Sequence, residues 1–483
     1  MSMMWRKKPI SAFEEDMKKS TLQRVLGKWS LTAIGIGAII GGGIFVLTGT
    51  AAHYHAGPAL ALSFVVAGIA CIFAALCYAE FASMLPVEGS AYAYAYGTVG
   101  ELFAWIIGWG LILEYAMGAM TVAVSWSGYF NKLLKLFGVE LPKVLTTDPF
   151  SYGDMALNLP AFVIVWVVTA ILVKGIKEAA GANNVIVVLK VTAVLFVIIV
   201  GAFAVDAANW VPFIPEAIEI PGENGAPHTA YGVGGIFGGA AAIFFAYIGF
   251  DAVSTQAGEA INPKRDMPFA IITSLLICTV LYIAVSLVLT GMINYKDIVG
   301  DALKAPVAAA FEKAGMPWAV FIITAAATTG LISVMLVMML GQTRVFLGMA
   351  KDGLLPEFFK SIHADFKTPY KSTILVGFVV SLVAAFTPIT VLGDMTSFGT
   401  LFAFAMVCGA VWILRSREPN LERGFRVPAL PVIATLGICT NLFLIYKLSY
   451  LAQMLAIGWL LIGVVVYFVY GQRHSNLNKI EQK

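Results

Sequence analysis

The sequence predicts an all-α integral membrane protein of about twelve transmembrane helices, and three observations support this fold class. Of the 483 residues, 59% are hydrophobic and only 12% are charged, whereas soluble domains carry about 25% charged residues. Apolar stretches long enough to cross a bilayer as helices recur along the whole chain, which does not fit the short alternating segments of a membrane β-barrel. Two glycine-rich stretches also lie five predicted helices apart, at 34–45 and 232–249.

The hydropathy pattern places the spans in order and divides the chain into segments. The predicted helices occupy 30–54, 57–85, 99–131, 157–174, 182–205, 232–259, 268–293, 317–349, 371–388, 391–414, 428–449 and 452–471. The resulting segments are an N-terminal segment (1–29), a first repeat of five helices (30–206), a second repeat (232–414), two additional helices (428–471) and a tail (472–483).

The distribution of lysine and arginine predicts the orientation. Counted over loops and helix ends, 23 basic residues lie on the side of both termini and seven on the other side. Basic residues concentrate in cytoplasmic loops, so both termini are predicted to be cytoplasmic. The absence of long loops and targeting tails suits a bacterial inner membrane. These two groups contain 30 of the 31 basic residues. The remaining one is Lys190, which lies in the middle of the fifth span.

The first span contains three consecutive glycines, Gly41, Gly42 and Gly43. Each glycine inside a helix costs about 1 kcal/mol relative to alanine. In hydrocarbon, an interrupted helix is tolerated only where its freed backbone groups face protein, water or a ligand. The first span is therefore predicted to be discontinuous, with the interruption facing a solute.

A matching glycine cluster opens the sixth span, at 232–239. An odd number of helices per repeat inverts the second repeat in the membrane. Inverted repeats with discontinuous first helices are typical of secondary transporters that bind substrate at the bilayer midplane. The alternative interpretation is that both glycine clusters only allow close helix packing.

Several other functions find no support in the sequence. The five cysteines lie in or at the edges of apolar segments without metal-ligand spacing, and the five histidines lie in or beside loops. No metalloprotease, P-loop or dinucleotide-binding fingerprint is present. The net charge of +3 is too small to suggest nucleic acid, and no soluble segment is long enough for an ATPase. We therefore expect neither an enzyme nor a cofactor or metal, and a monomer or weak oligomer among membrane lipid.

Several motifs together resemble the amino acid–polyamine–organocation transporter superfamily, closest to its cationic amino acid transporter branch. The resemblance covers nearly the whole chain and implies a leucine-transporter-like fold of five plus five inverted helices, with alternating access for amino acids. The motifs are Ile-Gly-Ala-Ile-Ile-Gly-Gly-Gly-Ile-Phe (36–45), Tyr-Ala-Glu-Phe-Ala-Ser-Met-Leu-Pro (78–86), Leu-Glu-Tyr (113–115), Phe-Ala-Tyr-Ile-Gly-Phe-Asp (245–251), Gly-Glu-Ala-Ile-Asn-Pro-Lys-Arg-Asp-Met-Pro (258–268) and Ala-Lys-Asp-Gly-Leu-Leu-Pro (350–356).

The candidate substrate-binding residues follow from the needs of an α-amino acid. N–H groups at the start of the second half of span one would meet the carboxylate, because the helix dipole there favours an anion. Carbonyl oxygens freed at the two interruptions would meet the ammonium group. We expect the carboxylate at Gly42, Gly43 and Ile44, and the ammonium at Ile39, Ile40, Phe245, Ala246 and Ile248. Phe245 also resembles the aromatic gate of the superfamily, although it could be an ordinary core aromatic.

Lys190 is the candidate for proton coupling. A charged side chain near mid-bilayer costs about 2.5–3.5 kcal/mol on insertion scales, so this lysine must be paired or neutral part of the time. In proton-coupled proteins that this chain resembles, a lysine on span five replaces the sodium ion. We expect Lys190 to donate to span-one carbonyls near Gly41 and to a span-eight hydroxyl such as Ser333. The alternative is a fixed ion pair with Glu114.

Two further residues bear on selectivity. Glu114, in the third span, would either meet a cationic substrate side chain or form a structural hydrogen-bonding unit. Met335, in the eighth span, would supply an apolar wall that tolerates small neutral substrates. The predicted function is proton-coupled uptake of arginine, lysine, ornithine and alanine. The alternatives are an amino acid exchanger, a polyamine carrier and, least favoured, a channel.

Overall fold

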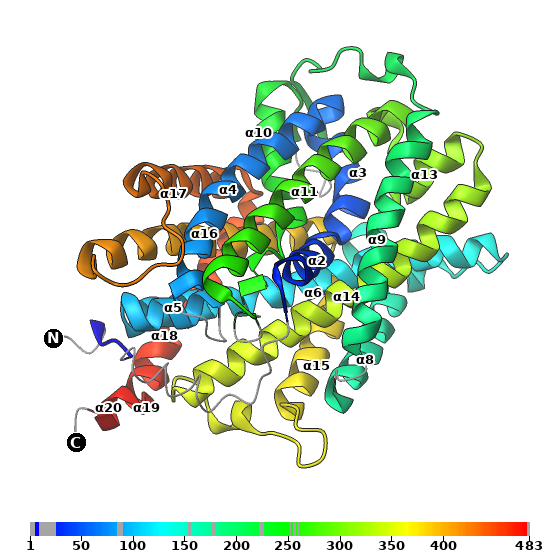
Figure 1. The fold of residues 1–483 in the computed structure, drawn as a ribbon. Coiled ribbons are helices and arrows are strands. Elements are labelled where there is room, and N and C mark those ends of the chain that lie inside the picture. The colour runs from blue at the N-terminus through cyan, green and yellow to red at the C-terminus, as the bar shows by residue number, and fades with distance from the viewer. Residues whose placement is uncertain are drawn as a thin grey trace.

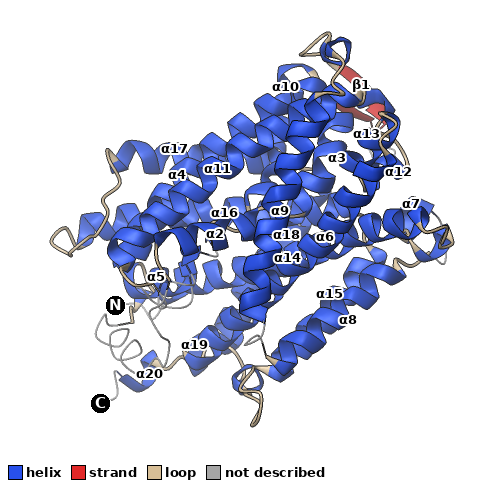
Figure 2. Cartoon of the chain, turned by 45° about the vertical axis from the view of Figure 1, so that its right-hand side comes forward, coloured by secondary structure: helices blue, strands red, loops and turns tan. Residues whose placement is uncertain are grey.

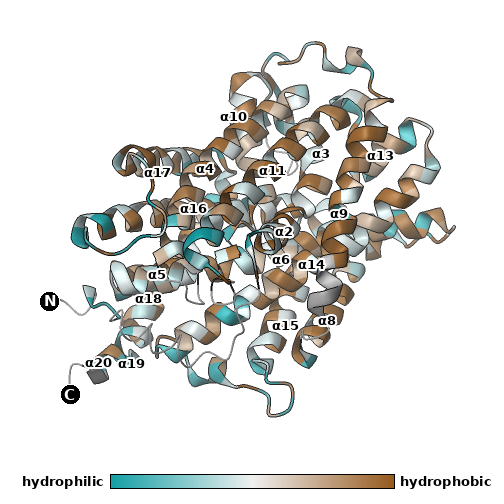
Figure 3. Cartoon of the chain, in the orientation of Figure 1, coloured by the Kyte–Doolittle hydropathy of each residue, from teal (hydrophilic) through white to brown (hydrophobic). Residues whose placement is uncertain are grey.

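The apolar stretches form a bundle of helices in a computed structural model of the chain (Figure 1). The structure describes residues 5–8, 26–84, 90–152, 156–175, 179–221, 227–251, 253–254, 257 and 260–480. Helices satisfy their own backbone hydrogen bonds, as a bilayer requires. Within the described ranges, eight helical stretches are long and apolar enough to cross a membrane, and three shorter helices are also apolar. Figure 3 shows hydrophobic residues along these helices and hydrophilic residues gathered in the connecting loops.

The first half of the chain runs from the first interrupted helix to the loop before the second. Its elements are α2 (Lys28–Ile39), η2 (Gly43–Leu47), α3 (Thr48–Ala51), η3 (Ala52–Ala56), η4 (Gly57–Ala59), α4 (Leu60–Met84), α5 (Ser90–Thr98), α6 (Glu101–Leu136), η5 (Lys143–Leu145), α7 (Pro149–Tyr152), α8 (Leu159–Lys174), α9 (Ala179–Ala202) and η6 (Ala207–Trp210). Here η marks short 3-10 or π-helical pieces.

The second half begins with a two-stranded hairpin. Its elements are β1 (Ile218–Pro221), β2 (Pro227–Ala230), α10 (Gly232–Ala242), η7 (Ile243–Tyr247), α11 (Pro263–Met292), η9 (Tyr295–Asp297), α12 (Asp301–Lys304), α13 (Pro306–Lys313), α14 (Pro317–Lys351), η10 (Glu357–Lys360), α15 (Tyr370–Phe386), α16 (Ile389–Arg417), α17 (Leu430–Lys447), α18 (Tyr450–Val466), η11 (Tyr467–Gly471), α19 (Gln472–His474) and α20 (Leu477–Ile480).

The two ends of the bundle differ in what covers them (Figure 2). On one end, here called the hairpin side, β1 and β2 pair antiparallel with Ile218 opposite Ala230. On the other, the terminal side, the described N-terminal residues dock on the start of α6, where the Glu101 N–H donates to the Arg6 carbonyl at 2.9 Å. The Ser475 hydroxyl, from the C-terminal segment, donates to the Glu101 carboxylate. Both ends of the chain therefore meet at the same helix terminus.

Each predicted span overlaps a helix of the structure, but several boundaries differ. α6 continues to Leu136, and α11 already begins at Pro263 with Pro268 inside its first turns. The short helices α5, α12 and α13 were not predicted, because they are too short for a spanning hydropathy signal. Most of the predicted N-terminal segment 1–29, the end of the tail, and Gly258 and Glu259 of the 258–268 motif lie outside the described residues.

Candidate functional site

The first interruption lies where the glycines predict it. α2 ends at Ile39, and Ile40 adopts an extended conformation with φ −70° and ψ 103°. The second half of the helix starts with η2 at Gly43. The first N–H groups of a helix have no partner within it, and the amides at 42–44 stand at this start.

The second interruption follows η7. Ile248 is extended, with ψ 135°, and Gly249 has a φ of 125°, which favours glycine. A Cβ atom at Gly249 would also lie 2.6 Å from the carbonyl carbon of Ala38. The second interruption therefore presses directly against the end of α2.

The two interruptions pack against each other through a second glycine. A Cβ at Gly43 would lie 2.3 Å from the Cα of Ala246. No larger residue fits between η2 and η7 in this arrangement. The first glycine cluster thus combines a helix break with close packing, whereas the cluster at 232–239 lies inside the continuous helix α10, where Gly235 and Gly239 allow close packing only.

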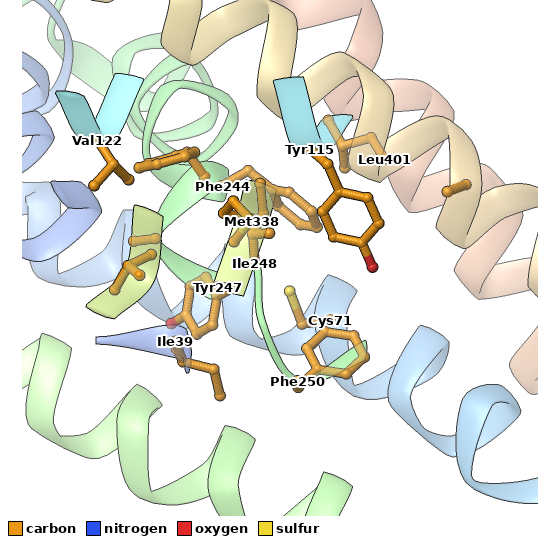
Figure 4. Packing of buried hydrophobic residues seen from close by; sticks show 14 of the residues in the cluster. Ile39, Cys71, Tyr115, Val122, Phe244, Tyr247, Ile248, Phe250, Met338 and Leu401 are labelled. Atoms are coloured by element: carbon orange, nitrogen blue, oxygen red, sulfur yellow. The ribbon is translucent and has the colours of Figure 1, made fainter. Parts of the chain in front are cut away.

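A small cavity lies at this junction, with a volume of about 10 Å³. A space of this size holds at most one water molecule, so an amino acid requires it to widen. Figure 4 shows Ile39, Ile248 and Met338 within the packed apolar layer around it. The cavity is lined by Ala38, Ile39, Gly41, Gly42, Gly43, Phe245, Ile248, Val334 and Met338. All nine are buried or half-buried, so the site is closed to both sides of the bundle.

The predicted substrate residues fall into two groups. Those lining the cavity are Ile39, Gly42, Gly43, Phe245 and Ile248, and Gly41 lies with them. Ile40, Ile44 and Ala246 are buried beside it without lining it. Met335 is buried in α14 but does not line the cavity; Val334 and Met338, which share another face of that helix, do.

Lys190, on α9, reaches the broken end of α2. Its ammonium donates to the carbonyl of Gly37, and to that of Ile40 at 3.1 Å. Its aliphatic stem lies against Gly330 of α14, where a Cβ would be 2.6 Å from the lysine Cγ. Two carbonyls at the negative end of a helix dipole therefore surround a single cation.

The other predicted partners of Lys190 are not in contact with it. The Ser333 hydroxyl donates to the Gly330 carbonyl of its own helix at 2.9 Å. No hydrogen bond joins Ser333 to Lys190 in the described part of the chain in this conformation. The described residues likewise hold no ion pair between Lys190 and Glu114.

Glu114 does not line the cavity. Glu114 is fully buried in α6. It packs closely against α16, because a Cβ atom added at Gly399 would lie 3.2 Å from the Glu114 Cβ. Neither of its carboxylate oxygens has a hydrogen-bond partner among the described residues. The neighbouring Tyr115 hydroxyl donates to Asp251 at 3.2 Å. In this conformation Glu114 is thus separated from the cavity.

Three polar residues that hold the interruptions had no distinctive signal in the sequence. The Tyr282 hydroxyl donates to the Ile39 carbonyl at 2.8 Å, and the Tyr129 hydroxyl to the Phe45 carbonyl at 2.7 Å. The Phe245 N–H donates to the Ser397 hydroxyl at 3.2 Å. The first bonds a carbonyl at the broken end of α2, and the other two bond backbone groups inside η2 and η7. Isolated tyrosines and serines in apolar helices occur throughout this chain, so none of the three stood out.

A family comparison agrees with this geometry. The model of the amino acid permease family matches residues 26–470. The chain belongs to this family. It is therefore a multi-pass membrane transporter of the amino acid–polyamine–organocation superfamily and not an enzyme, and the family implies the leucine-transporter-like fold.

Three relatives indicate the range of substrates within the family. The chain is 47% identical to the branched-chain amino acid permease BcaP of Bacillus subtilis (strain 168), over 95% of this chain and 96% of the relative. It is 44% identical to the methylthioribose transporter of the same strain, over 99% of this chain and 100% of the relative. It is 40% identical to the vacuolar cationic amino acid transporter 2 of Arabidopsis thaliana, over 86% of this chain and 63% of the relative.

Proposed function

We propose that the chain is a proton-coupled, secondary-active carrier of L-amino acids that works by alternating access. One arrangement carries the proposal: two facing helix interruptions enclose an apolar cavity, and a buried lysine occupies the carbonyls of the first. Residues 30–206 and 232–414 would be the inverted repeats, and 428–471 the additional helices. The basic-residue count supports placing both termini in the cytoplasm of a cell membrane.

The backbone would recognise the parts common to all α-amino acids. The substrate carboxylate would accept hydrogen bonds from the amides at 42–44, at the positive end of the second half-helix. The ammonium would meet carbonyls of η7 and of Ile39 or Ile40. Both of those span-one carbonyls already accept one hydrogen bond, but a carbonyl has a second lone pair.

Lys190 would couple a proton to this site. When charged, its ammonium holds the carbonyls of Gly37 and Ile40 and so fixes the end of α2. Loss of its proton would remove a cation from the carbonyls and weaken that hold. Because these carbonyls border the substrate cavity, protonation and closure of the site would be linked.

The cavity wall favours aliphatic side chains. Val334, Met338 and Phe245 offer no polar group to a substrate side chain. Leucine-like and small neutral amino acids are therefore the proposed primary substrates, in keeping with the name of the 47% identical relative. Arginine, lysine and ornithine would be secondary substrates, since Glu114 would have to become accessible to them as the cavity widens.

A second candidate substrate is methylthioribose, because a relative that is similar over the whole chain carries that name. This molecule combines an apolar thioether with sugar hydroxyls and has no carboxylate. It would use the apolar wall but not the helix dipole at 42–44. Polyamines also lack a carboxylate and are disfavoured for the same reason.

Uptake into proteoliposomes tests the proposal. Labelled leucine, alanine, arginine, putrescine and methylthioribose are each offered with an imposed proton or sodium gradient. We expect an inward proton gradient, and not a sodium gradient, to concentrate leucine and alanine. Uptake that occurs only when amino acid is present inside would overturn symport in favour of exchange. Concentration of methylthioribose alone would overturn the substrate assignment.

A further inference from the structure

A second and much larger cavity lies away from the interruptions, between α6, α16 and α18. Its volume is about 310 Å³. The residues that line it are Trp105, Ile106, Trp109, Phe402, Ile457, Leu460, Leu461, Gly463 and Val464. Ile457 and Leu461 are 47% and 62% exposed. Because α18 is a spanning helix, the mouth of this cavity opens toward the hydrocarbon of the bilayer.

The wall of this cavity offers no hydrogen bonds to an occupant. The Trp105 indole N–H donates to the Gly463 carbonyl at 2.8 Å, and that of Trp109 to the Trp459 carbonyl at 2.8 Å. The remaining lining side chains are aliphatic or phenyl groups. The part of a ligand that enters must therefore be hydrocarbon.

The size of the cavity suits a hydrocarbon ligand. An engineered apolar cavity of about 150 Å³ already binds benzene, and this one is about 310 Å³. The cavity is thus large enough for part of an acyl chain.

The depth of the cavity places it in the leaflet of the terminal side. α6 begins at Glu101, and Trp105 and Trp109 follow about 6 and 12 Å along the helix at about 1.5 Å per residue. Glu101 is also where the chain ends converge, since its carboxylate accepts from Tyr467 at 3.0 Å and from Ser475. Hydrocarbon in the cavity would therefore have its polar end beside this convergence.

Two basic residues are close in sequence to the residues that meet at Glu101. Lys7 follows Arg6, whose carbonyl accepts from the Glu101 N–H, and Arg473 lies two residues before Ser475. Arg473 is exposed and Lys7 is half-buried. Neither takes part in an ion pair within the described ranges. Basic groups at the membrane surface attract anionic lipid headgroups.

We propose that the cavity between α6, α16 and α18 binds one acyl chain of an anionic phospholipid from the terminal-side leaflet. The lipid phosphate lies toward Lys7 and Arg473. The Trp105 and Trp109 rings, which stack with centroids 5.5 Å apart, form the rigid inner wall for the chain. This site is independent of the substrate cavity and of the proposed transport activity.

Native mass spectrometry of the full-length, delipidated protein, titrated with phosphatidylglycerol or phosphatidylcholine, tests the site. Leu461→Trp places an indole in the mouth of the cavity, and Leu455→Trp on the same helix is the control, since Leu455 is 47% exposed but does not line the cavity. We expect Leu461→Trp to weaken the tightest phosphatidylglycerol site about tenfold, which corresponds to about 1.4 kcal/mol. Leu455→Trp should bind as the unmodified protein does.

A charge variant tests the headgroup. Lys7→Gln combined with Arg473→Gln should remove the preference for phosphatidylglycerol over phosphatidylcholine while phosphatidylcholine binding persists. Equal binding by the two tryptophan variants, or no preference for the anionic lipid in the unmodified protein, would overturn the proposal. Should Leu461→Trp fail to fold, Ile457→Phe fills the same mouth and replaces it.

Discussion

Lys190 donates hydrogen bonds to backbone carbonyls that the break in the first helix leaves without a partner. The last carbonyls of a helix have no partner within it, and at the end of α2 they face the interior of the bundle. The Ile36 carbonyl accepts a hydrogen bond from the Ile40 N–H, and the Ile39 carbonyl accepts one from the Tyr282 hydroxyl. The Gly37 and Ile40 carbonyls both accept from the Lys190 ammonium. One lysine thus satisfies two of the carbonyls, and its charge suits the negative end of the helix dipole.

Removing this ammonium should abolish coupling. Lys190→Ala leaves the Gly37 and Ile40 carbonyls without their donor, at a cost of about 1–3 kcal/mol for each buried group left unsatisfied. We expect the variant to lose concentrative, proton-dependent uptake in proteoliposomes. Lys447→Ala, at the end of α17, is the control and should transport normally. Undiminished proton-driven accumulation by Lys190→Ala would contradict the coupling role.

Gly43 sets the distance between the two interruptions. A methyl group there would overlap the backbone of Ala246 at 2.3 Å, and overpacking of this kind costs about 1–3 kcal/mol. We expect Gly43→Ala to lower the melting temperature in detergent and to abolish uptake. Gly348→Ala in α14 is the matched control, because its Cβ would meet nothing within 4 Å. Equal melting temperatures for the two variants would refute the packing argument.

The elements of the site show what the sequence can and cannot predict. Three consecutive glycines predict the break at Ile40 because glycine disfavours a helix more than any residue type except proline. Lys190 is the one basic residue in the middle of a predicted span, and the cost of a charge in the bilayer likewise predicts that it has a polar partner there. In contrast, α14 is apolar around most of its circumference and buried along most of its length. Periodicity therefore does not reveal which side of α14 faces the cavity: the sequence predicts Met335 there, whereas Val334 and Met338 line it.

Outside the site, a buried ionic cluster joins α4 to α16 and the loop that follows. The Glu80 carboxylate accepts from Arg415, from the Arg423 Nε at 3.1 Å and from the Val427 N–H at 2.8 Å. Both Glu80 and Arg423 are buried. The Arg423 side chain is 1% exposed, and this carboxylate is the counter-charge that offsets the burial of its guanidinium.

Loss of that carboxylate should destabilise the protein strongly. Glu80→Ala leaves a buried cation uncompensated, which typically costs about 3–5 kcal/mol, so we expect a clear drop in melting temperature. The control is Glu422→Ala in the exposed pair with Lys264. There the hydrogen bond from Lys264 lowers the pKa of Glu422, but water screens the pair and little stability should be lost. Equal drops in melting temperature for the two substitutions would show that the buried cluster stabilises the protein no more than the exposed pair does.

At the scale of the whole molecule, the closed cavity implies motion. Its volume of about 10 Å³ excludes an amino acid, and Val334 in its wall is buried. The packing that closes it runs through Gly43, Gly249 and the end of α2. Binding therefore requires the halves of the interrupted helices to separate from their neighbours. In the proposed alternating-access cycle they would do so first on one side and then on the other.

Cysteine accessibility measures this motion. In a Cys439→Ser background, the four other cysteines are buried, so a charged thiol reagent should report on an introduced Val334→Cys. Lys264→Cys and Lys296→Cys, both exposed and on opposite predicted sides, mark the two faces. We expect Lys264→Cys to react only from the cytoplasmic face and Lys296→Cys only from outside. Val334→Cys should react slowly from both faces, and saturating leucine should protect it. Reaction of Val334→Cys from one face only, in the absence of leucine, would contradict alternating access, because a carrier must open its site in turn to each side of the membrane.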